Sequence, residues 1–267
     1  MSSDEAAYAD LFDRLERERG FRGNLYRQKC LRRRVAVRMR ARGVADVSDY
    51  SALLDNDPEE YERLLRVLTI NVSKFFRNQE TWVVIREEVM PELLQRGGPL
   101  LMWSAGSACG EEAYSLAILA WDWLARTGFG GWNGIRIIGT DIDGRSLDAA
   151  RTGEYPAAAL DETPADLKRQ WFEADGPYRL KEPIPRLVEF RQRDILAGRP
   201  EFDADLILCR NLLIYLDREA QRQVFEIFVE TLRSGGFLVL GRVEMLDARV
   251  RDVFEVVNPR ERIYRKR

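Results

Sequence analysis

The sequence contains no histidine in 267 residues. This absence excludes Ser-His-Asp and Cys-His catalysis, histidine metal ligands and an imidazole general base. The three cysteines, Cys30, Cys109 and Cys209, are far apart and odd in number, which favours reduced thiols over a disulfide framework and makes no plausible zinc site. Whatever chemistry the chain performs must therefore proceed without an imidazole, and we expect no metal.

Long apolar runs are also absent. No stretch approaches the roughly 18 uninterrupted apolar residues of a membrane span, and residues 1–5 lack the basic-then-apolar pattern of a signal peptide. We therefore expect a cytoplasmic protein with no membrane insertion. The net charge of −2 and the hydrophobic fraction of 45% describe a globular chain, and 267 residues suit one α/β domain with a modest accessory piece.

What the sequence does contain is a strand, a glycine-bearing turn and a helix start over residues 100–112. A second expected strand, residues 135–140, leads directly into Asp141. This succession predicts an α/β sheet that binds a nucleoside-bearing cofactor. Gly106 would let the backbone approach a ligand closely, the helix start offers free N–H groups, and Asp141 can accept both ribose hydroxyls.

The spacing does not fit a dinucleotide. A pyrophosphate site needs Gly-x-Gly-x-x-Gly, whereas Gly110 is followed here by Glu111 and Glu112, which would repel a phosphate. Two carboxylates suit the positively charged methionine moiety and the ribose of S-adenosylmethionine, although a plain first-turn acid is an equal alternative for Glu112. Methyl transfer from a sulfonium to a carboxylate needs no histidine, because a carboxylate with a reference pKa of about 4.3 is already ionised.

The chain is expected to begin with a helical domain, residues 1–70. Apolar residues recur there at helical spacing, namely Tyr8, Leu11, Phe12 and Leu15, then Leu31, Val35 and Met39, then Tyr61, Leu64, Leu65 and Leu68. The last of these helices has Asp57 as its N-cap, Pro58 at its first position and Glu60 closing a capping box. Residues 71–99 are expected to form a linker that contributes to the active site and carries a helix over residues 80–94.

The remainder, residues 100–267, is the expected cofactor-binding domain. A stretch rich in proline and aromatic residues, 154–186, interrupts it as an inserted subdomain. Further expected elements are a helix over 144–151, strands over 188–191, 205–209 and 237–241, a helix over 218–233 that stops at residues 234–236, and an antiparallel pair of 253–257 with 262–265. The expected fold is thus a Rossmann-like α/β sheet with a small N-terminal all-helical domain and a short insert.

Polar residues follow several of these strands. Ligands of open α/β sheets bind outside the carboxyl ends of the strands, so we expect Gly106, Asp141, Asp194 and the pair Arg210-Asn211 to converge on one crevice. Asp194 would then accept a hydrogen bond from an adenine amino group, with Ile195 packed on the ring. A turn-forming aspartate is the alternative for Asp194.

Five parts of the chain form a pattern when they are taken in order. They are the basic helical domain, Asn-Val-Ser-Lys-Phe-Phe-Arg at 71–77, Trp-Ser-Ala at 103–105 with Gly-Glu-Glu-Ala-Tyr-Ser at 110–115, Thr-Asp-Ile-Asp at 140–143 and Cys-Arg-Asn-Leu-Leu-Ile-Tyr at 209–215. Together they resemble the CheR-type chemotaxis receptor methyltransferases. The resemblance covers nearly the whole chain. It implies methylation of glutamate side chains on the cytoplasmic helices of chemoreceptors, giving glutamate γ-methyl esters and S-adenosylhomocysteine.

The same resemblance implies the lining of the cofactor site. Its members would be Asn71, Ser73, Arg77, Glu111, Asp141, Asp194, Ile195, Arg210 and Asn211. Arg77 and Tyr215 would be the groups nearest the transferred methyl. The planar fork of an arginine can orient a substrate carboxylate, and a tyrosine hydroxyl can hold that carboxylate or the amino-acid end of the cofactor. If the resemblance is left aside, residues 75–77 are interpreted as two core aromatic residues beside a surface charge. Tyr215 is then as well explained by a packing role as by a functional one.

The helical domain carries a second signal. From Arg22 to Arg42 the sequence has nine lysines or arginines and no acidic residue. Such a run is usually a solvated face, but here Leu31, Val35 and Met39 anchor one side and leave the arginines for a partner. In the terms of the family, this partner is the acidic surface of a chemoreceptor helical bundle. Nucleic-acid phosphates are the alternative, and the pI of about 5.6 argues against them.

One segment departs from the family pattern. Family members commonly have Gly-His-Ser-Glu where this chain has Gly241-Arg242-Val243-Glu244. We expect the change to leave cofactor binding intact and to alter the rim of the site on the substrate side. It motivates a third hypothesis, a cofactor-binding signalling or scaffold protein without turnover, beside the glutamate methyltransferase and a methyltransferase of nucleic acid or another acceptor.

Overall fold

The computed structural model describes residues 3–69, 73–127, 134–174 and 176–267, which group into two compact units. The first unit comprises residues 1–70 together with 214–221, and the second comprises residues 71–213 together with 222–267. The sequence did not predict that residues 214–221 belong with the N-terminal helices. All three cysteines are free thiols.

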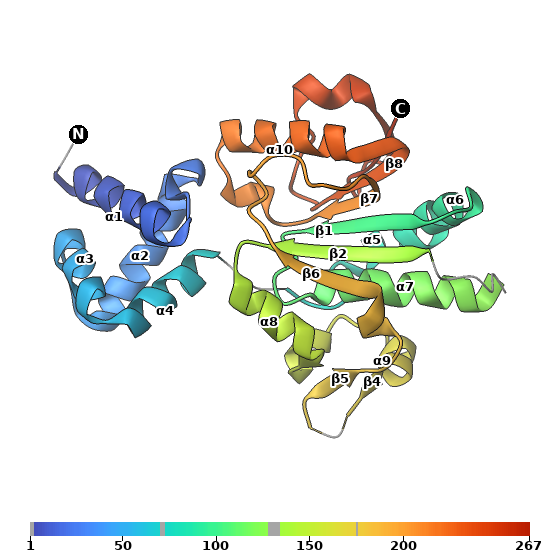
Figure 1. Cartoon of the computed structure of the whole chain (residues 1–267), viewed down its shortest axis with the longest axis horizontal. Coiled ribbons are helices and arrows are strands. Elements are labelled where there is room, and N and C mark those ends of the chain that lie inside the picture. Colours follow the sequence, from blue (N-terminus) through green and yellow to red (C-terminus); the bar gives the residue numbers. More distant parts are fainter. Residues whose placement is uncertain (1–2, 70–72, 128–133, 175) are drawn as a thin grey trace. The chain divides into compact units, whose positions relative to one another are not determined.

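The first unit is helical, as expected (Figure 1). Its elements are α1 (Ser3–Arg19), η1 (Gly23–Leu25), α2 (Gln28–Arg42), α3 (Val47–Asn56) and α4 (Pro58–Thr69). The apolar residues at helical spacing form its core, with Leu11, Leu15 and Val35 fully buried. Helix α3 was missed because it spans only ten residues, although Asp46 caps it by accepting from the N–H of Ser48 at 2.7 Å.

The predicted capping box of α4 is half right. Asp57 accepts from the N–H of Glu60 at 3.0 Å, but the Glu60 side chain does not return to the cap. Its fully buried carboxylate accepts instead from Arg38 Nε at 2.9 Å and from Tyr50 Oη at 2.7 Å. Burial opposes ionisation, but the hydrogen bonds from Arg38 and Tyr50 lower the pKa of Glu60. Leaving a buried carboxylate without partners costs more free energy than leaving a helix end without a second cap, so the Glu60 side chain bonds Arg38 and Tyr50.

The basic run is also partly used inside the unit. Arg38 pairs with Glu60 at 2.6 Å, Arg42 lies 2.8 Å from Asp57, and Arg34 donates to the carbonyl of Val67. The expectation that the whole run faces a partner is therefore wrong for these arginines. The exposed positions of α2 include Lys29, Arg33, Val37 and Arg40, which share one face of the helix.

The second unit is built on a seven-stranded sheet in the order β6-β2-β1-β7-β8-β10-β9. Figure 1 labels its strands from β6 to β8. The bounds are β1 (Leu100–Ala105), β2 (Ile135–Asp141), β6 (Val188–Gln192), β7 (Ala204–Cys209), β8 (Leu232–Leu240), β9 (Phe254–Asn258) and β10 (Ile263–Lys266). Strands β6, β2, β1, β7 and β8 pair in parallel, and β10 pairs antiparallel with β8 and β9, as predicted for the last two. The fold class read from the sequence is confirmed.

Helices cover both faces of this sheet. Figure 1 shows α7 (Glu111–Thr127) and α8 (Gly144–Thr152) on one side and α10 (Arg218–Thr231) on the other. Residues 79–95 form a helical stretch of α5 (Gln79–Val84), η2 (Ile85–Val89) and α6 (Met90–Gln95), close to the predicted bounds. Its apolar side, which includes Ile85 and Val89, is buried in the core of this unit. Among the described residues, no helix is long and apolar enough to cross a membrane.

The end of α10 differs from the prediction. The helix ends at Thr231 and β8 begins at Leu232, so Ser234-Gly235-Gly236 does not terminate a helix. Gly235 has φ +75°, and the pairing of β7 with β8 shifts register between Ala204 and Leu206. The glycines allow an irregular start of the strand, since a positive φ costs glycine little.

The insert forms a small sheet of its own. Its strands β3 (Glu154–Tyr155), β4 (Phe172–Glu173) and β5 (Tyr178–Leu180) pair antiparallel in the order β3-β5-β4. The connecting pieces are η3 (Ala157–Leu160), α9 (Ala165–Trp171) and η4 (Ile184–Leu187), and η6 (Ala248–Val253) precedes β9. Phe75 contacts the rings of Tyr155 and Phe172 edge to face, which ties the insert to the segment before α5.

Candidate functional site

The topology brings the predicted strand-end residues to one edge of the sheet. Because β6, β2, β1 and β7 are parallel neighbours, their carboxyl ends lie side by side. Asp194 follows β6, Asp141 ends β2, Gly106 follows β1, and Arg210 and Asn211 follow β7. This edge is where ligands of open α/β sheets bind.

The turn after β1 is tight and needs its glycines. The N–H groups of Gly106 and Ser107 both donate to the carbonyl of Thr140, at 2.9 and 2.8 Å. Gly106 has φ +79°, and a Cβ there would lie 2.9 Å from Leu212 Cδ2. Ala108 has φ +47°, which an alanine rarely adopts. The turn is thus held against the end of β2 in a strained conformation, as is common at ligand sites.

Asp141 fastens this turn. Its Oδ2 accepts from the N–H of Ala108 at 2.8 Å and its Oδ1 from the N–H of Asp143 at 3.0 Å. Burial raises the pKa of Asp141, and these N–H bonds lower it. Each carboxylate oxygen has a further lone pair, so the same group can still accept hydroxyls. The ribose contact itself remains a prediction.

Glu111, the first residue of α7, is the most unusual group at this edge. Its side chain is buried, and burial raises its pKa to about 7 against the lowering effect of a hydrogen bond from Ser73. Within the described part of the chain, its buried Oε2 has no hydrogen-bond partner. A buried carboxylate oxygen without a partner is costly. Such an oxygen can accept a hydrogen bond from a ligand ammonium, and the cofactor contact expected for Glu111 stays a prediction.

Glu112 has a structural role that the sequence left open. Its Oε1 accepts from Ser104 Oγ at 2.9 Å, and its Oε2 lies 3.6 Å from Arg210 Nη1. Burial raises the pKa of Glu112, and the charge of Arg210 lowers it. Glu112 therefore links β1, α7 and the end of β7. It is a first-turn acid with a structural role, which agrees with the alternative weighed for Glu112.

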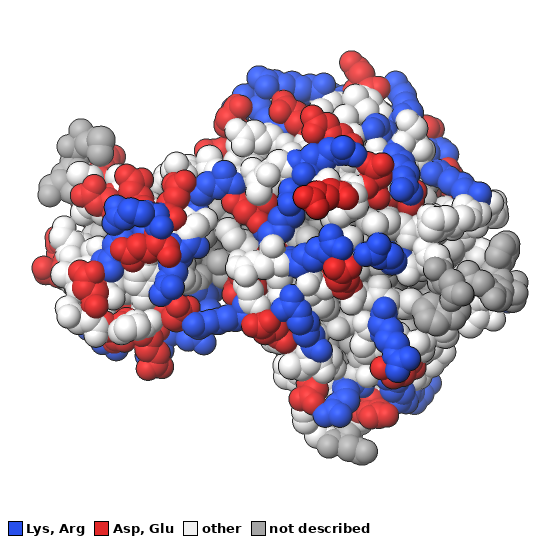
Figure 2. Space-filling view, viewed as in Figure 1, with Lys and Arg blue, Asp and Glu red and all other residues white. Residues whose placement is uncertain are grey.

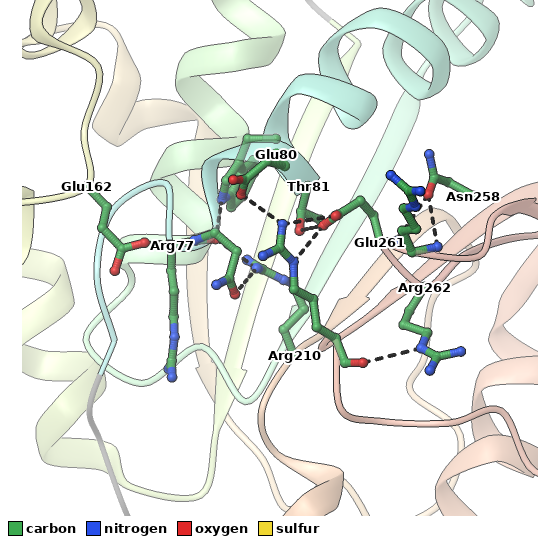
Figure 3. Close-up of polar contacts among 12 residues, drawn as sticks. Arg77, Glu80, Thr81, Glu162, Arg210, Asn258, Glu261 and Arg262 are labelled. Carbon is green, nitrogen blue, oxygen red and sulfur yellow. Dashed lines mark hydrogen bonds and ion pairs between the residues drawn. The ribbon is translucent and has the colours of Figure 1, made fainter.

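Arg210 holds the segment that contains Arg77 (Figure 3). The buried Arg210 donates from Nη2 to the carbonyl of Arg77 at 2.7 Å and to Asn78 Oδ1 at 3.1 Å. Its guanidinium also lies 5.6 Å from the ring centroid of Trp82, whose Nε1 donates to the same Arg77 carbonyl at 3.1 Å. Arg210 thus positions Arg77 and Asn78.

The backbone on both sides of Arg77 is strained. Phe76 has φ +53° and Asn78 has φ +58°, conformations that persist only where the surroundings hold them. The N–H of Phe76 donates to Ser115 Oγ at 3.0 Å, and the N–H of Asn78 donates to Glu162 Oε2 at 2.8 Å. Phe75 and Phe76 are indeed core aromatics, as the alternative interpretation had it, but Arg77 is fixed between clamped residues.

Two carboxylates of this region escaped the sequence interpretation. Glu244 Oε2 accepts from the N–H of Gly241 at 2.7 Å and of Asn211 at 3.0 Å, which joins the loops after β8 and β7. Glu162 comes from the insert. The Gly-x-x-Glu spacing at 241–244 was a usable signal for Glu244, whereas nothing local marks Glu162.

The remaining predicted residues are placed as follows. Asp194 Oδ1 accepts from the N–H of Leu196 at 2.8 Å, so the turn-forming interpretation is right for that oxygen, and Ile195 beside it is half-buried. Tyr215 belongs to the helical unit, where its carbonyl accepts from the N–H of Arg27 at 2.8 Å and Arg34 lies 5.7 Å from its ring centroid. Asn71 lies outside the described residues.

A parallel sheet with a glycine turn after β1, an acid at the end of β2 and a buried acid at the start of α7 defines a nucleoside-cofactor domain of the doubly wound class. The family model "CheR methyltransferase, SAM binding domain" matches residues 71–263, and "CheR methyltransferase, all-alpha domain" matches residues 6–69. The chain belongs to the CheR methyltransferase family, and it is an S-adenosylmethionine-dependent methyltransferase.

Named relatives agree with this assignment. A chemotaxis protein methyltransferase of Listeria innocua is 32% identical over 87% of this chain and 87% of its own length. Chemotaxis protein methyltransferase 2 of Pseudomonas aeruginosa is 34% identical over 79% and 76%. An uncharacterized 104.1 kDa protein of Rhodobacter capsulatus is 33% identical over 90% of this chain, which spans only 25% of that relative.

Proposed function

We propose that this protein methylates glutamate side-chain carboxylates on the cytoplasmic helices of chemoreceptors and produces glutamate γ-methyl esters. The observation that carries the proposal is Arg77, clamped between Phe76 and Asn78 at the cofactor edge, in a chain whose relatives of similar length are chemotaxis protein methyltransferases. Since that partner lies in the cytoplasm, we propose the same compartment for this protein.

The cofactor supplies a methyl group bound to a sulfonium, and the residues of this chain bind and orient the two reactants. Glu111 would pair with the ammonium of the cofactor, Asp141 would accept the ribose hydroxyls, and Asp194 with Ile195 would hold the adenine. Further lining would come from Asn71, Ser73, Gly106, Arg210 and Asn211. Together these contacts would hold the methyl group at the carboxyl ends of the strands.

Arg77 would orient the acceptor carboxylate, because its planar fork matches two carboxylate oxygens. No general base is required, since the acceptor is ionised at neutral pH and carries no proton to remove. Positioning of two reactants can lower a barrier by about 7–11 kcal/mol, which suits a site without histidine.

The product distinguishes this proposal from its alternatives. Methyl label transferred to receptor cytoplasmic fragments should be released as volatile methanol in alkali, because methyl esters are hydrolysed there. Alkali-stable label on protein or nucleic acid would contradict ester formation. Tight cofactor binding with no label on any receptor fragment would favour a scaffold.

Asp141→Asn should weaken the affinity for S-adenosylhomocysteine about tenfold. The amide loses one acceptor for the ribose and turns a donor towards the N–H groups of Ala108 or Asp143. Isothermal titration calorimetry measures the change, with Asp148→Asn on the exposed face of α8 as the matched control. An unchanged Kd for Asp141→Asn would mean that the nucleoside lies elsewhere.

We further propose that the exposed face of α2 docks on the acidic surface of the receptor bundle. Lys29, Arg33 and Arg40 supply its charge, and Val37, 46% exposed, gives it an apolar centre. Residues 22–42 contain no acidic residue. On the face of the molecule seen in Figure 2, by contrast, acidic and basic side chains are interspersed.

Charge reversal at Arg33 and Arg40 together should raise the KM for receptor fragments about tenfold at low salt, and the difference should shrink as salt is added. Arg38 is unsuitable for this test because it pairs with the buried Glu60. Arg17→Glu on α1, where the side chain is 72% exposed, is the control. A salt-independent rate equal to that of the control would rule out this docking face.

A further inference from the structure

Arg242, at the position where the sequence departs from the family pattern, joins three segments of the second unit. It follows β8, and its Nε and Nη2 donate to the two oxygens of Glu261 at 3.0 and 2.9 Å. Nη2 also donates to Glu80 Oε2 at 2.7 Å. Glu80 lies in the first turn of α5, three residues after Arg77.

Glu261 is itself fixed. It lies in the turn between β9 and β10, where its N–H donates to Asn258 Oδ1 at 3.1 Å. Its nearly buried carboxylate also accepts a short hydrogen bond from the buried Thr81 Oγ1 in α5. Arg242 therefore connects the first turn of α5 to the turn between β9 and β10, both directly through Glu80 and indirectly through Glu261 and Thr81.

We infer that Arg242 is a positioning residue for methyl transfer: it holds the first turn of α5, and through it the strained segment that carries Arg77. The inference rests on the proposed function, because Arg77 is the group proposed to orient the acceptor. Arg210 and Glu162 hold this segment from the side of β7 and of the insert. Arg242 holds its helical end.

The expected effect of Arg242 is on catalytic geometry more than on stability. Its side chain is 38% exposed, and ion pairs at such exposure contribute little to folding. A displacement of about 1 Å in a group that orients a reactant can cost about 10²-fold in rate. The positive φ values at Phe76 and Asn78 favour such a displacement once one restraint is removed.

The test compares Arg242→Gln with Arg233→Gln. Arg233 lies in β8 and donates to the two oxygens of Asp205 at 3.1 and 3.0 Å. The side chains of this pair are 47% and 9% exposed. The pair is therefore a close match to Arg242 and Glu261, whose side chains are 38% and 10% exposed. We expect Arg242→Gln to lower kcat for receptor methylation about tenfold. Its Kd for S-adenosylhomocysteine and its melting temperature should stay close to those of Arg233→Gln, and Arg242→Lys should recover part of kcat.

A double-mutant cycle with Glu80→Gln adds a readout that a merely structural role would not give. If Arg242 acts partly through Glu80, Arg242→Gln should lower kcat less in the Glu80→Gln background than in the wild type. An unchanged kcat in Arg242→Gln would overturn the inference while wild-type ester formation still supports the proposed function. Additive effects in the cycle would overturn the direct route through Glu80. Absence of alkali-labile methylation in the wild type would instead refute the proposed function.

Discussion

Replacing Arg77 with alanine is expected to lower kcat for glutamate methylation by about 10²- to 10³-fold. The substitution removes the planar fork that orients the acceptor carboxylate and leaves the backbone clamps on the Arg77 carbonyl in place. Because Arg210 and Trp82 donate to the main-chain carbonyl of residue 77, the substitution should leave the fold of the segment unchanged. Affinity for S-adenosylhomocysteine should change by less than about tenfold, since the other proposed cofactor contacts are retained.

Single-turnover methylation of a receptor fragment measures this effect apart from product release. Arg77→Lys should recover part of the rate, because it keeps the charge but loses the two-pronged geometry. Arg86→Ala in the same helical stretch removes an arginine whose side chain is 45% exposed and pairs with the neighbouring Glu87. It should behave as the wild type. An Arg77→Ala enzyme with the rate of Arg86→Ala would show that Arg77 is only a surface charge.

Glu111→Gln is expected to weaken cofactor affinity at pH 8 by about 10- to 100-fold, as the loss of a charged hydrogen bond in a buried site predicts. In the wild type, the Glu111 carboxyl must lose its proton to form an ion pair with the ammonium of the cofactor. Because burial raises the pKa of Glu111 to about 7, affinity should rise as the pH is raised through 7. In Glu111→Gln this pH dependence should be absent.

The raised pKa of Glu111 has the opposite effect on folding stability: without cofactor, the protein becomes less stable as the pH rises through 7. A carboxyl whose pKa is raised by folding contributes stability below its unfolded pKa of about 4.5, and this contribution is lost as the pH rises through 7. Glu111→Gln removes the buried charge. It should therefore increase the free energy of unfolding at pH 8 by about 1–3 kcal/mol relative to the wild type, and by little at pH 4.5.

Titration calorimetry and urea unfolding at several pH values check both results. Glu226→Gln, an exposed position of α10, is the control and should change neither quantity. If Glu111→Gln retained wild-type affinity with an unchanged pH profile, the unpartnered oxygen would have another purpose. If Glu111→Gln were less stable than the wild type at pH 8, burial could not be the cause of a raised pKa of Glu111.

Much of the second unit was predictable because its signals are local. Strands of the parallel sheet are short apolar runs, and the turn after β1 shows its glycines directly in the sequence. Parallel order then follows from alternating strands and helices, and it brings Asp141 and Arg210 to one edge without any knowledge of the side chains. The resemblance to the family added the names of residues, not their geometry.

The contacts that hold the site were not predictable, because each joins residues far apart in the chain. Arg210 reaches Arg77 across 133 positions, and Arg242 reaches Glu80 across 162. Hydrophobic periodicity and caps report only on neighbours within a few residues. Glu60 illustrates the same limit, since its local capping role yields to a buried partner 22 positions away, Arg38.

Tyr215 marks a different limit. The family pattern links it by sequence to Arg210 and Asn211, yet residues 214–221 group with the N-terminal helices. The chain leaves the sheet unit after Leu213 and returns at Arg222, and no composition shift in the sequence announces this change. A position in a motif therefore does not fix the compact unit to which a side chain belongs.

A crystal structure with bound S-adenosylhomocysteine tests the central claim most directly. We predict the amino group of the ligand within about 3.2 Å of a Glu111 carboxylate oxygen, and the ribose hydroxyls at similar distances from Asp141. Both contacts should lie at the carboxyl ends of β1 and β2. Ligand density elsewhere, or density at this edge with both carboxylates turned away from it, would contradict the account.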